Sequence, residues 1–522
     1  MTSQRWVRLR QIVQYLFLAL FLYLFILTVK DRWSPLPVDL FYRLDPLAAI
    51  SASLAGRTIP TKLLWALITL VATLILGRVW CGWVCPLGTL LDLFHFRSLL
   101  NSLRPLYSGW RQVKYFLLFV VLISALFANL TLLILDPITI LTRTLATVVM
   151  PALNYAFTTV EFGLYGFRPL QTPLAWLDTA LRGTVLPATS GEFLYPLYQL
   201  NVLFALLFIG ILSLNLFTDR FWCRHLCPLG ALLGLLSKVS WLRRVVGPGC
   251  NQCRRCGGDC TMGTIEPERG FASDPSECIV CLACLGTCPQ EGVTFEVARW
   301  LSTAAVLAEW RSYDPSRRQL LASLATSVGS LALVRTSPIA RREHPYAVRP
   351  PGARENDLLA KCIRCGKCIK VCPTAGLQPS LSEAGLEGLW TPVLVSRLGY
   401  CDYSCNACGQ VCPSEAIPDL TLEEKRQTVI GLAYIDQNRC IPWADNVDCI
   451  VCEEMCPVPD KAIKLDEVEV LDTQGELVAV KRPRVVRDLC IGCGICEYAC
   501  PLNGEAAIRV YVPNEFDYEE LA

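Results

Sequence analysis

The residues most able to do chemistry in this chain are its 28 cysteines. Four groups follow the spacing C-x2-C-x2-C-x3-C, which is the ligand spacing of bacterial [4Fe-4S] ferredoxins. They are Cys250, Cys253, Cys256 and Cys260; Cys278, Cys281, Cys284 and Cys288; Cys362, Cys365, Cys368 and Cys372; and Cys490, Cys493, Cys496 and Cys500. Two variant groups open with a longer gap: Cys401, Cys405, Cys408 and Cys412, and Cys440, Cys449, Cys452 and Cys456. The six groups, each named here by its first cysteine, predict about six [4Fe-4S] clusters.

The spacing within a group has a chemical cause. Short gaps wrap a tight loop around three corners of an iron–sulfur cube, and the fourth cysteine ligates a neighbouring cluster, so groups work in pairs. A proline, which fixes φ and removes a backbone donor, follows the fourth cysteine in every group except the first, where Thr261 stands.

The Cys250 and Cys278 groups lie close together in sequence, and we expect them to pair. One cluster then takes Cys250, Cys253, Cys256 and Cys288, and the other takes Cys278, Cys281, Cys284 and Cys260. For the last four groups the sequence order leaves neighbouring pairing and nested pairing both open.

Disulfides and zinc are the other common uses of many cysteines. Disulfide frameworks belong mainly to small secreted chains, and this chain has 522 residues and apolar segments that look membrane-spanning. Zinc sites often recruit histidine, yet only His95, His225 and His344 are present. Repeated ferredoxin spacing therefore favours iron–sulfur clusters.

The remaining four cysteines form two matching C-x3-C-P-L-G motifs, one with Cys81 and Cys85 and one with Cys223 and Cys227. Their thiols are expected to converge at one face of a membrane. The three-residue gap is not that of a ferredoxin group, so a cluster, a redox-active thiol pair and an inert packed pair all stay open, although two matching motifs make the inert pair the least favoured.

Four apolar runs approach the length of about 20 residues that crosses a bilayer. They cover residues 12–29, 63–76 with an extension to 80, 115–135 and 200–217. The first run lacks the cleavage site of a removable signal peptide. The predicted fold class is an α-helical membrane domain of four spans, with a candidate fifth in the linker, joined to small α+β ferredoxin-like domains.

Charge and composition set the orientation and the class of partner. Lys and Arg are more frequent in the segments on the N-terminal side, which predicts a cytoplasmic N-terminus in a bacterial inner membrane. The formal net charge of +2 argues against a nucleic-acid partner. We expect a membrane domain at 1–245, a two-cluster ferredoxin at 246–300, a linker at 301–354 and a four-cluster domain at 355–522.

These motifs carry a resemblance to known families. Residues 1 to about 300 resemble the NapH-type membrane quinol dehydrogenase subunit, through the four spans, the motifs at Cys81 and Cys223, and the paired ferredoxin groups. Residues from about 315 resemble the NapG/MauM-type polyferredoxin. The resemblance implies quinol oxidation at the membrane and delivery of electrons to a periplasmic redox protein or oxidoreductase, such as a cytochrome or a molybdoenzyme.

The resemblance also implies a nested pairing of the last four groups. One cluster would take Cys362, Cys365, Cys368 and Cys500, and a second Cys490, Cys493, Cys496 and Cys372. A third would take Cys401, Cys405, Cys408 and Cys456, and the fourth Cys440, Cys449, Cys452 and Cys412. The long first gap of the Cys440 group makes the last set the weakest carry-over.

The linker contains Ser316-Arg317-Arg318 followed by a mildly apolar run to Val334. This pattern is typical of a twin-arginine export signal, which would place a folded four-cluster domain in the periplasm. A basic linker with an amphipathic helix is the competing interpretation.

The expected function is electron transfer from membrane quinol through the clusters, as a quinol dehydrogenase-type subunit with lipid and the quinone pool as partners. No residue set resembles a hydrolytic triad, a phosphate loop or a dinucleotide fold, and His95 and Trp83 are only weak candidates for a quinone site. Two rivals remain: all clusters in the cytoplasm feeding electrons to quinone, and a redox-sensing or accessory protein for a partner metalloenzyme.

Overall fold

A computed structural model of the chain describes residues 3–29, 34–94, 108–185, 198–267, 270–290, 292–297, 344–381, 383–471 and 477–513, with short pieces between 321 and 329. Two compact units result, and each is described by itself. The first comprises Met1–Phe25, Ser34–Thr144 and Val202–Val334, and the second Ile26–Trp33, Leu145–Asn201 and Arg335–Ala522.

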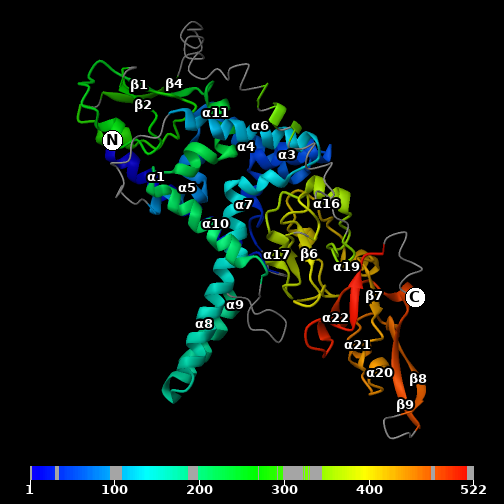
Figure 1. Cartoon of the computed structure of the whole chain (residues 1–522). Coiled ribbons are helices and arrows are strands. Elements are labelled where there is room, and N and C mark those ends of the chain that lie inside the picture. Colours follow the sequence, from blue (N-terminus) through cyan, green and yellow to red (C-terminus); the bar gives the residue numbers. More distant parts are fainter. Residues whose placement is uncertain are drawn as a thin grey trace. The chain divides into compact units, whose positions relative to one another are not determined.

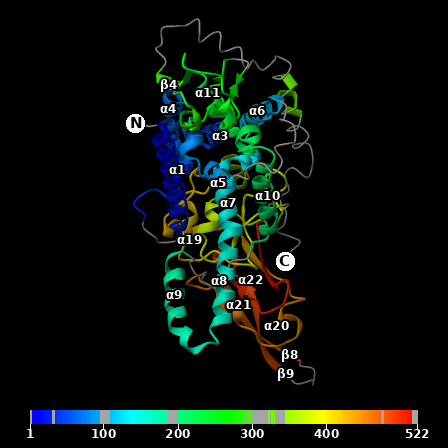
Figure 2. The same ribbon diagram turned by 90° about the vertical axis from the view of Figure 1, so that its left-hand side faces the viewer.

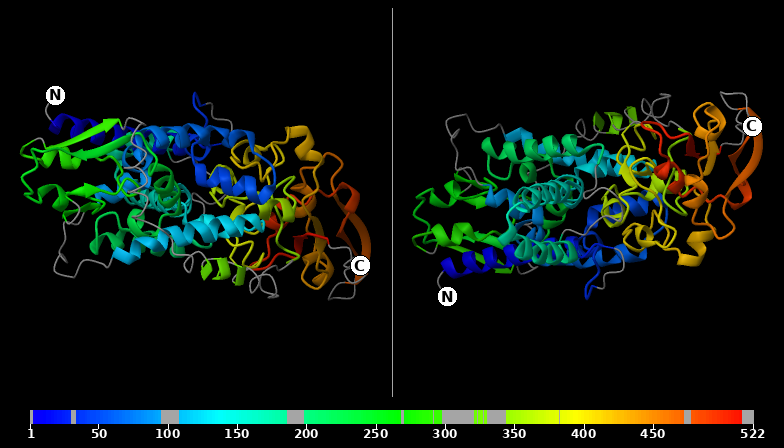
Figure 3. Two further views of the ribbon diagram at one scale, coloured as in Figure 1. Left: turned by 90° about the horizontal axis from the view of Figure 1, so that it is seen from above. Right: turned by 90° about the horizontal axis from the view of Figure 1, so that it is seen from below.

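The first unit begins with a set of apolar helices (Figure 1). Its helices are α1 (Ser3–Ile26), α2 (Leu40–Arg43), α3 (Pro46–Gly56), α4 (Ala66–Leu76), α5 (Pro86–Leu93), α6 (Gln112–Leu126), α7 (Pro137–Thr144), α10 (Asn201–Ser213) and α11 (Pro228–Ser237). Shorter turns are η1 (Thr61–Trp65), η3 (Ser108–Arg111), η4 (Thr131–Leu135) and η7 (Leu214–Leu216). Helix α6 packs against α3 and α11, and α11 also packs against α4, so these helices share one core. Figure 3 shows the helices of this unit from above and from below.

One helix among the described residues, Gln4–Ile26, is long and apolar enough to cross a membrane. The prediction of four spans is therefore not confirmed. The third predicted span, 115–135, is interrupted because α6 ends at Leu126 and Ala128 adopts a left-handed φ of 58° before η4 begins. The 15 residues of α6 extend about 22 Å, less than the roughly 30 Å hydrocarbon core of a bilayer.

The two C-x3-C-P motifs have the same local structure. Each forms a π-helical turn, η2 (Trp80–Val84) or η8 (Trp222–Leu226), then an extended cysteine, then a helix with proline in its first turn. Such turns are frequent at functional sites. An arginine stands three residues before each motif, so the full repeat reads R-x-W-C-x3-C-P-L-G.

A second repeat lies at the start of two other helices of this unit, α3 and α7. Asp45 and Asp136 each stand in a Leu-Asp-Pro sequence and accept backbone hydrogen bonds at the N-termini of α3 and α7, at 2.9 to 3.3 Å. Both carboxylates are buried. Capping of this kind satisfies backbone N–H groups that a helix leaves without partners. The two halves of the apolar region are therefore built alike.

The first unit also contains a ferredoxin module. Strand β1 (Leu242–Val246) pairs with β4 (Val293–Val297), and β2 (Ile265–Glu266) with β3 (Ala272–Ser273), both antiparallel. Two short helices, α12 (Arg255–Gly258) and α13 (Ala283–Thr287), carry cysteines. Strand β1 crosses the expected domain boundary at residue 245.

The second unit contains a helical hairpin, which Figure 2 shows as α8 (Met150–Leu164) and α9 (Gln171–Thr184), preceded by η5 (Leu145–Val149) and joined through η6 (Arg168–Leu170). Arg182 of α9 donates to Asn154 and Thr158 and forms an ion pair with Glu161, all on α8. This hairpin was not predicted from the sequence.

The rest of the second unit is built from short helices and antiparallel strand pairs. The helices are α16 (Glu355–Lys361), α17 (Lys367–Val371), α18 (Ala407–Gln410), α19 (Leu422–Gln427), α20 (Ile441–Ala444), α21 (Val451–Glu454), η11 (Arg487–Leu489) and α22 (Ile495–Ala499). The strand pairs are β5 (Leu377–Pro379) with β6 (Pro392–Leu394), β7 (Leu432–Ile435) with β10 (Ile508–Tyr511), and β8 (Ile463–Leu471) with β9 (Leu477–Val485). Buried cysteines sit within its hydrophobic core. Arg317 and Arg318 lie outside the described residues.

Candidate iron–sulfur sites

The four regular cysteine groups share one backbone conformation. In each, the residues directly before and after the second cysteine are left-handed, as in Gly492 (φ 72°) and Gly494 (φ 80°) around Cys493. The other three groups use Gln252 and Arg254, Val280 and Leu282, and Arg364 and Gly366. A non-glycine residue pays about 1–3 kcal/mol for such a conformation when it is not otherwise favoured, and Val280 is β-branched. This repeated strain is typical of a loop shaped for a ligand.

The third cysteine of every group lies on a short helix. The helices α12, α13, α17, α18, α21 and α22 carry Cys256, Cys284, Cys368, Cys408, Cys452 and Cys496, respectively. The two variant groups keep this helix despite their longer first gaps. The fourth cysteine follows it, as expected for a residue that reaches a neighbouring site.

The ferredoxin module of the first unit has the expected crossed arrangement for one cluster. Cys260 interacts electrostatically with Cys278 and Cys284, away from its own group. Burial, followed by the charges of Cys281 and other thiols, raises the pKa of Cys278 to about 12. Cys256 lies near Cys250 and Cys253, as the other predicted set requires. Cys288 packs against the same small core.

The Cys362 and Cys401 groups pair with each other in the second unit. Cys412 interacts with Cys362, Cys365 and Cys368, and these four thiols line one small cavity. Burial, then Cys412 and Cys362, raises the pKa of Cys365 to about 12.

The reciprocal exchange completes this pair. Cys372 interacts with Cys401 and Cys408, and both of these interact with Cys405.

The Cys440 and Cys490 groups form the second pair. Cys500 joins Cys440, Cys449 and Cys452 around a second small cavity, which is otherwise lined largely by apolar residues. Cys456 interacts with Cys490 and Cys493. The nested pairing implied by the resemblance is therefore wrong, because α17 packs against α18 and α21 against α22. Each fourth cysteine consequently meets the adjacent group in sequence.

The two pairs adjoin each other within the second unit. The Cys401 N–H donates to the Cys493 carbonyl at 2.8 Å, and the two thiols interact electrostatically. Arg397 clamps the same junction by donating to the carbonyls of Glu497, Cys500, Leu502 and Gly504. The four sites therefore follow one order, which runs from the Cys362 site through the Cys401 and Cys490 sites to the Cys440 site.

Cations lie beside several of these thiols. Arg244 interacts with Cys256 and Cys284, so it lies near both sites of the ferredoxin module. Arg364 interacts with Cys362, and the 97% buried Lys425 interacts with Cys401 and donates to the Asp402 carbonyl at 2.6 Å. Positive charge favours the anionic thiolates that bind iron and offsets the negative charge of a loaded site.

The four cysteines of the C-x3-C-P motifs are buried and converge within the first unit. Each interacts electrostatically with the other three. The Gly230 N–H donates to Cys227 Sγ at 3.2 Å. The structure therefore brings these thiols together as expected.

The first motif docks on the ferredoxin loop between Cys278 and Cys281. Trp83 Nε1 donates to the Val280 carbonyl at 2.9 Å, and a Cβ at Gly82 would collide with the Ile279 carbonyl oxygen, so only glycine fits. Trp83 thus serves as a docking residue, and His95 lies outside the described residues.

A buried ionic contact holds the same junction, and the sequence analysis missed it. Glu277 Oε2 lies 2.5 Å from Lys114 Nζ and 3.4 Å from Arg78 Nη1, while Tyr115 donates to Glu277 Oε1 at 3.0 Å. Burial opposes the charge of Glu277, but Lys114 and Arg78 outweigh it and hold its pKa below the ordinary value.

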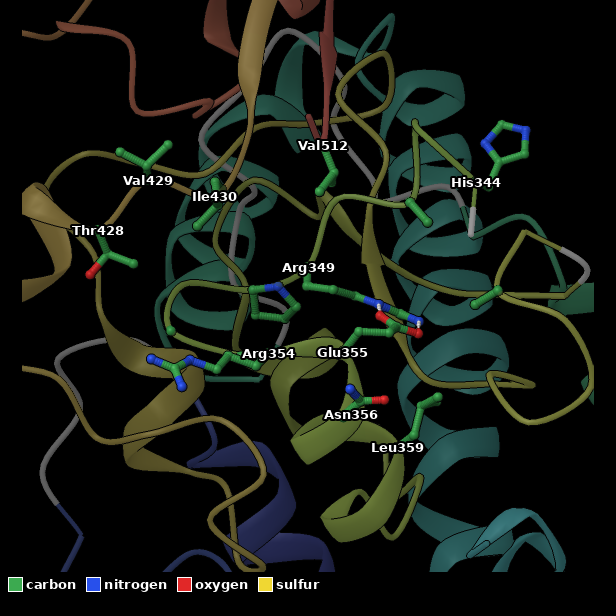
Figure 4. Close-up of a pocket in the computed structure, with 15 residues that line it drawn as sticks. His344, Arg349, Arg354, Glu355, Asn356, Leu359, Thr428, Val429, Ile430 and Val512 are labelled. Atoms are coloured by element: carbon green, nitrogen blue, oxygen red, sulfur yellow. Dashed lines mark hydrogen bonds and ion pairs between the residues drawn. The ribbon is translucent and has the colours of Figure 1, made fainter. Parts of the chain in front are cut away.

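A large cavity of about 640 Å³ lies in the second unit, but none of its lining residues is a cysteine. Figure 4 shows Arg349 paired with Glu355 inside it, through Nε and Oε2 at 2.5 Å. The chemistry is therefore expected at the thiols rather than here.

No group of three or more His, Cys, Asp or Glu side chains among the described residues fits around a single metal ion. The ligand sets rest instead on the shared cavities, the burial and the mutual interactions of the thiols.

Comparison with known proteins agrees with this chemistry. A 4Fe-4S binding domain model matches residues 58–103 and 200–248, a 4Fe-4S dicluster domain model matches 270–373, and a further 4Fe-4S binding domain model matches 483–503. No solved structure matches the chain.

Named relatives identify the family. The methylamine utilization ferredoxin-type protein MauM of Methylorubrum extorquens is 38% identical over 212 residues, which cover 39% of this chain and 91% of that protein. The ferredoxin-type protein NapG of Escherichia coli is 35% identical over 213 residues, which cover 38% of this chain and 88% of that protein. Because it spans most of each relative at this identity, the chain belongs to the family of MauM/NapG ferredoxin-type proteins.

Proposed function

We propose that this iron–sulfur electron-transfer protein takes electrons from membrane quinol through its first unit and delivers them, through its second unit, to a redox protein outside the membrane. When bound, the [4Fe-4S] clusters supply one-electron carriers whose potentials the protein tunes. The chain's own residues hold the sites, set their spacing and supply compensating charge.

The junction between the apolar helices and the ferredoxin module carries this proposal. Lys114, Tyr115 and Glu277 form a buried contact one residue from the ligand Cys278. Burying two cations around one carboxylate costs several kcal/mol unless geometry and hydrogen bonds compensate. A contact of this kind favours a fixed arrangement of the apolar helices against a cluster site, as electron entry from the membrane requires.

Contacts near the start and just after the end of α1 lie in different units. Near its start, Val7 lies close to Gly286 of the ferredoxin module, within the first unit. Just after its end, Thr28 accepts a hydrogen bond from Lys367 of the Cys362 group at 3.4 Å, within the second unit. Under the proposal, α1 spans the membrane, the ferredoxin module is cytoplasmic and the four-cluster domain is periplasmic.

The segment between α7 and α10 supports the same sidedness. With a cytoplasmic N-terminus and the four predicted spans, residues 145–201 lie outside the membrane, and they belong to the unit that contains the last four cysteine groups. Tyr198 of this segment packs into the core that holds Cys362 and Cys412.

The Cys440 site is the proposed exit for electrons. It ends the order of four sites, and Val447, Ile450 and Met455 around it are 56%, 43% and 46% exposed. We propose that a one-electron acceptor docks over these apolar side chains. The name of the MauM relative gives one context, methylamine utilization. Under the proposal, the acceptor of this chain is a one-electron redox protein.

The test uses sealed spheroplasts and purified full-length protein. A reporter active only outside, fused after Ala522, should give signal, and replacing Arg317 and Arg318 with lysine should silence it while an inside-active reporter gains signal. Anaerobic quinol should reduce part of the clusters in the purified protein. A silent outside reporter in the wild type supports the all-cytoplasmic rival, and clusters that quinol never reduces support the accessory-protein rival.

A further inference from the structure

The four-thiol site, defined as Cys81, Cys85, Cys223 and Cys227, is not one of the six ferredoxin groups. All four side chains are at least 92% buried, and every one of the six possible pairs interacts electrostatically. Two separate repeats of one sequence motif deliver them to one place. The segments 58–103 and 200–248, which match a 4Fe-4S binding domain model, contain these cysteines and none of the six groups.

The charge around this site is unbalanced. Arg78, Arg220 and Lys114 are each at least 99% buried, and Arg10 is 91% buried. Arg220 is paired with Asp92 through Nε and Oδ1 at 2.5 Å, and Arg10 shares that carboxylate at 3.6 Å. Arg78 and Lys114 share Glu277. These cations outnumber the two carboxylates, and Arg78, Arg220 and Lys114 each interact electrostatically with at least one of the four thiols.

The arginines approach the thiol site directly. Arg78 Nη2 lies 4.0 Å from Cys81 Sγ, and Arg220 Nη1 donates to the Cys81 carbonyl at 3.0 Å. Gly230 packs against both Arg78 and Cys227, since a Cβ there would lie 2.9 Å from Arg78 Nη2 and 3.4 Å from Cys227 Sγ.

This charge narrows the uses of the thiols. Neutral thiols or disulfides leave excess buried positive charge without compensation, which is costly in an apolar interior. An oxidised cubane core with four thiolates carries two negative charges and offsets this excess. A zinc ion with four thiolates carries the same charge, but the matching 4Fe-4S binding domain model favours the cubane, and the zinc assay below separates the two.

We propose that Cys81, Cys85, Cys223 and Cys227 bind a seventh iron–sulfur cluster of the four-iron type, whose charge Arg78 and Arg220 balance. This site adjoins the Cys278 site, because Arg220 interacts with both Cys223 and Cys281 and because Trp83 and Gly82 pack on the intervening loop. It goes beyond the proposed function, since it assigns a cofactor whether or not quinol is the donor.

The test counts iron, acid-labile sulfide and zinc in anaerobically purified full-length protein. The wild type should contain about 28 irons, and the Cys85→Ser/Cys227→Ser variant about 24, with a matching fall in sulfide. Mössbauer spectra of iron-57 protein should show the remaining six clusters unchanged, which serves as the internal control for folding. Equal iron in both proteins overturns the proposal, as does zinc that the variant loses.

A second pair of variants keeps the test decisive if the cysteine variant fails to accumulate. Arg78→Gln should lower the occupancy or the midpoint potential of one cluster, and Arg78→Lys should restore it, because the positive charge is kept. Wild-type protein with all six groups loaded but only about 24 irons overturns the proposal without any variant. Loss of quinol reduction with the iron count preserved would instead refute the proposed function alone.

Discussion

Pairs of cysteine substitutions should reveal which groups share a cluster in the second unit. Cys365 and Cys412 line one cavity, whereas Cys500 lines another with Cys440 and Cys449. Two substitutions that strike one cluster should cost no more iron than either alone. Two that strike different clusters should add.

The magnitudes follow from four irons in each cube. Against about 24 irons in the six groups, Cys365→Ala and Cys412→Ala should each leave about 20, and their combination should also leave about 20. Cys365→Ala with Cys500→Ala should leave about 16. Nested pairing predicts the opposite result, with about 16 irons for the Cys365 and Cys412 combination and about 20 for the Cys365 and Cys500 combination. Any iron at the four-thiol site raises all counts equally and leaves the differences intact.

The assay is iron per chain with electron paramagnetic resonance of each variant, all purified without oxygen. The combination of Cys449→Ala with Cys500→Ala is the matched control, because it should also behave as one lesion. A three-iron remnant would lower each loss but keep the non-additivity. Additive losses for Cys365 with Cys412, together with non-additive losses for Cys365 with Cys500, would refute the pairing drawn from the structure.

Three other perturbations test the groups around the thiols. Glu277→Gln should weaken the ferredoxin junction by about 3–5 kcal/mol, because Lys114 and Arg78 lose their counter-charge, whereas substitution of the exposed Glu296 by Gln should have no such effect. Amide hydrogen exchange across 272–290 measures both variants, and equal protection in the two would contradict the ionic role of Glu277. Lys425→Gln should lower the midpoint potential of the Cys401 site by on the order of 100 mV, which is the effect of removing a unit charge at about 6 Å with an effective dielectric constant of about 20. Lys481→Gln on β9 should leave that potential unchanged, and a redox titration that shows no difference between the two variants would exclude the charge effect. Arg397→Ala should destabilise the junction of the two cluster pairs by about 3 kcal/mol, because four backbone carbonyls lose a hydrogen-bond donor. The measurement is the denaturant concentration at which visible absorbance is lost, and a change in unfolding free energy under about 0.5 kcal/mol would show that Arg397 is dispensable.

Cysteine spacing predicted the ligand groups and the partnership of Cys260 with the Cys278 group, which the interactions of Cys260 support, whereas the short helices that carry each third cysteine were not predicted. These features are local, because three ligands sit within seven residues and the fourth lies at the end of one helical turn. The pairing of the Cys362 group with the Cys401 group was not predictable in this way. It depends on the packing of α17 against α18, which spacing does not encode.

The four-thiol site was partly readable. The repeated cysteines predicted convergence, and the repeated arginines at 78 and 220 were a further signal that sequence reasoning did not use. Glu277 offered no signal, because its role arises only when Lys114 from a distant helix meets it. The prediction of four spans was not confirmed, and in the third span apolar composition did not reveal the left-handed break at Ala128.

Quantifying iron, acid-labile sulfide and zinc in protein purified without oxygen tests the central claim most directly. The account predicts at least about 24 irons per chain, with equal sulfide and little zinc, because six cysteine groups each hold a four-iron cube. A fully folded preparation with about eight irons or fewer, or with zinc in place of iron, would contradict the claim that this protein is an iron–sulfur electron carrier.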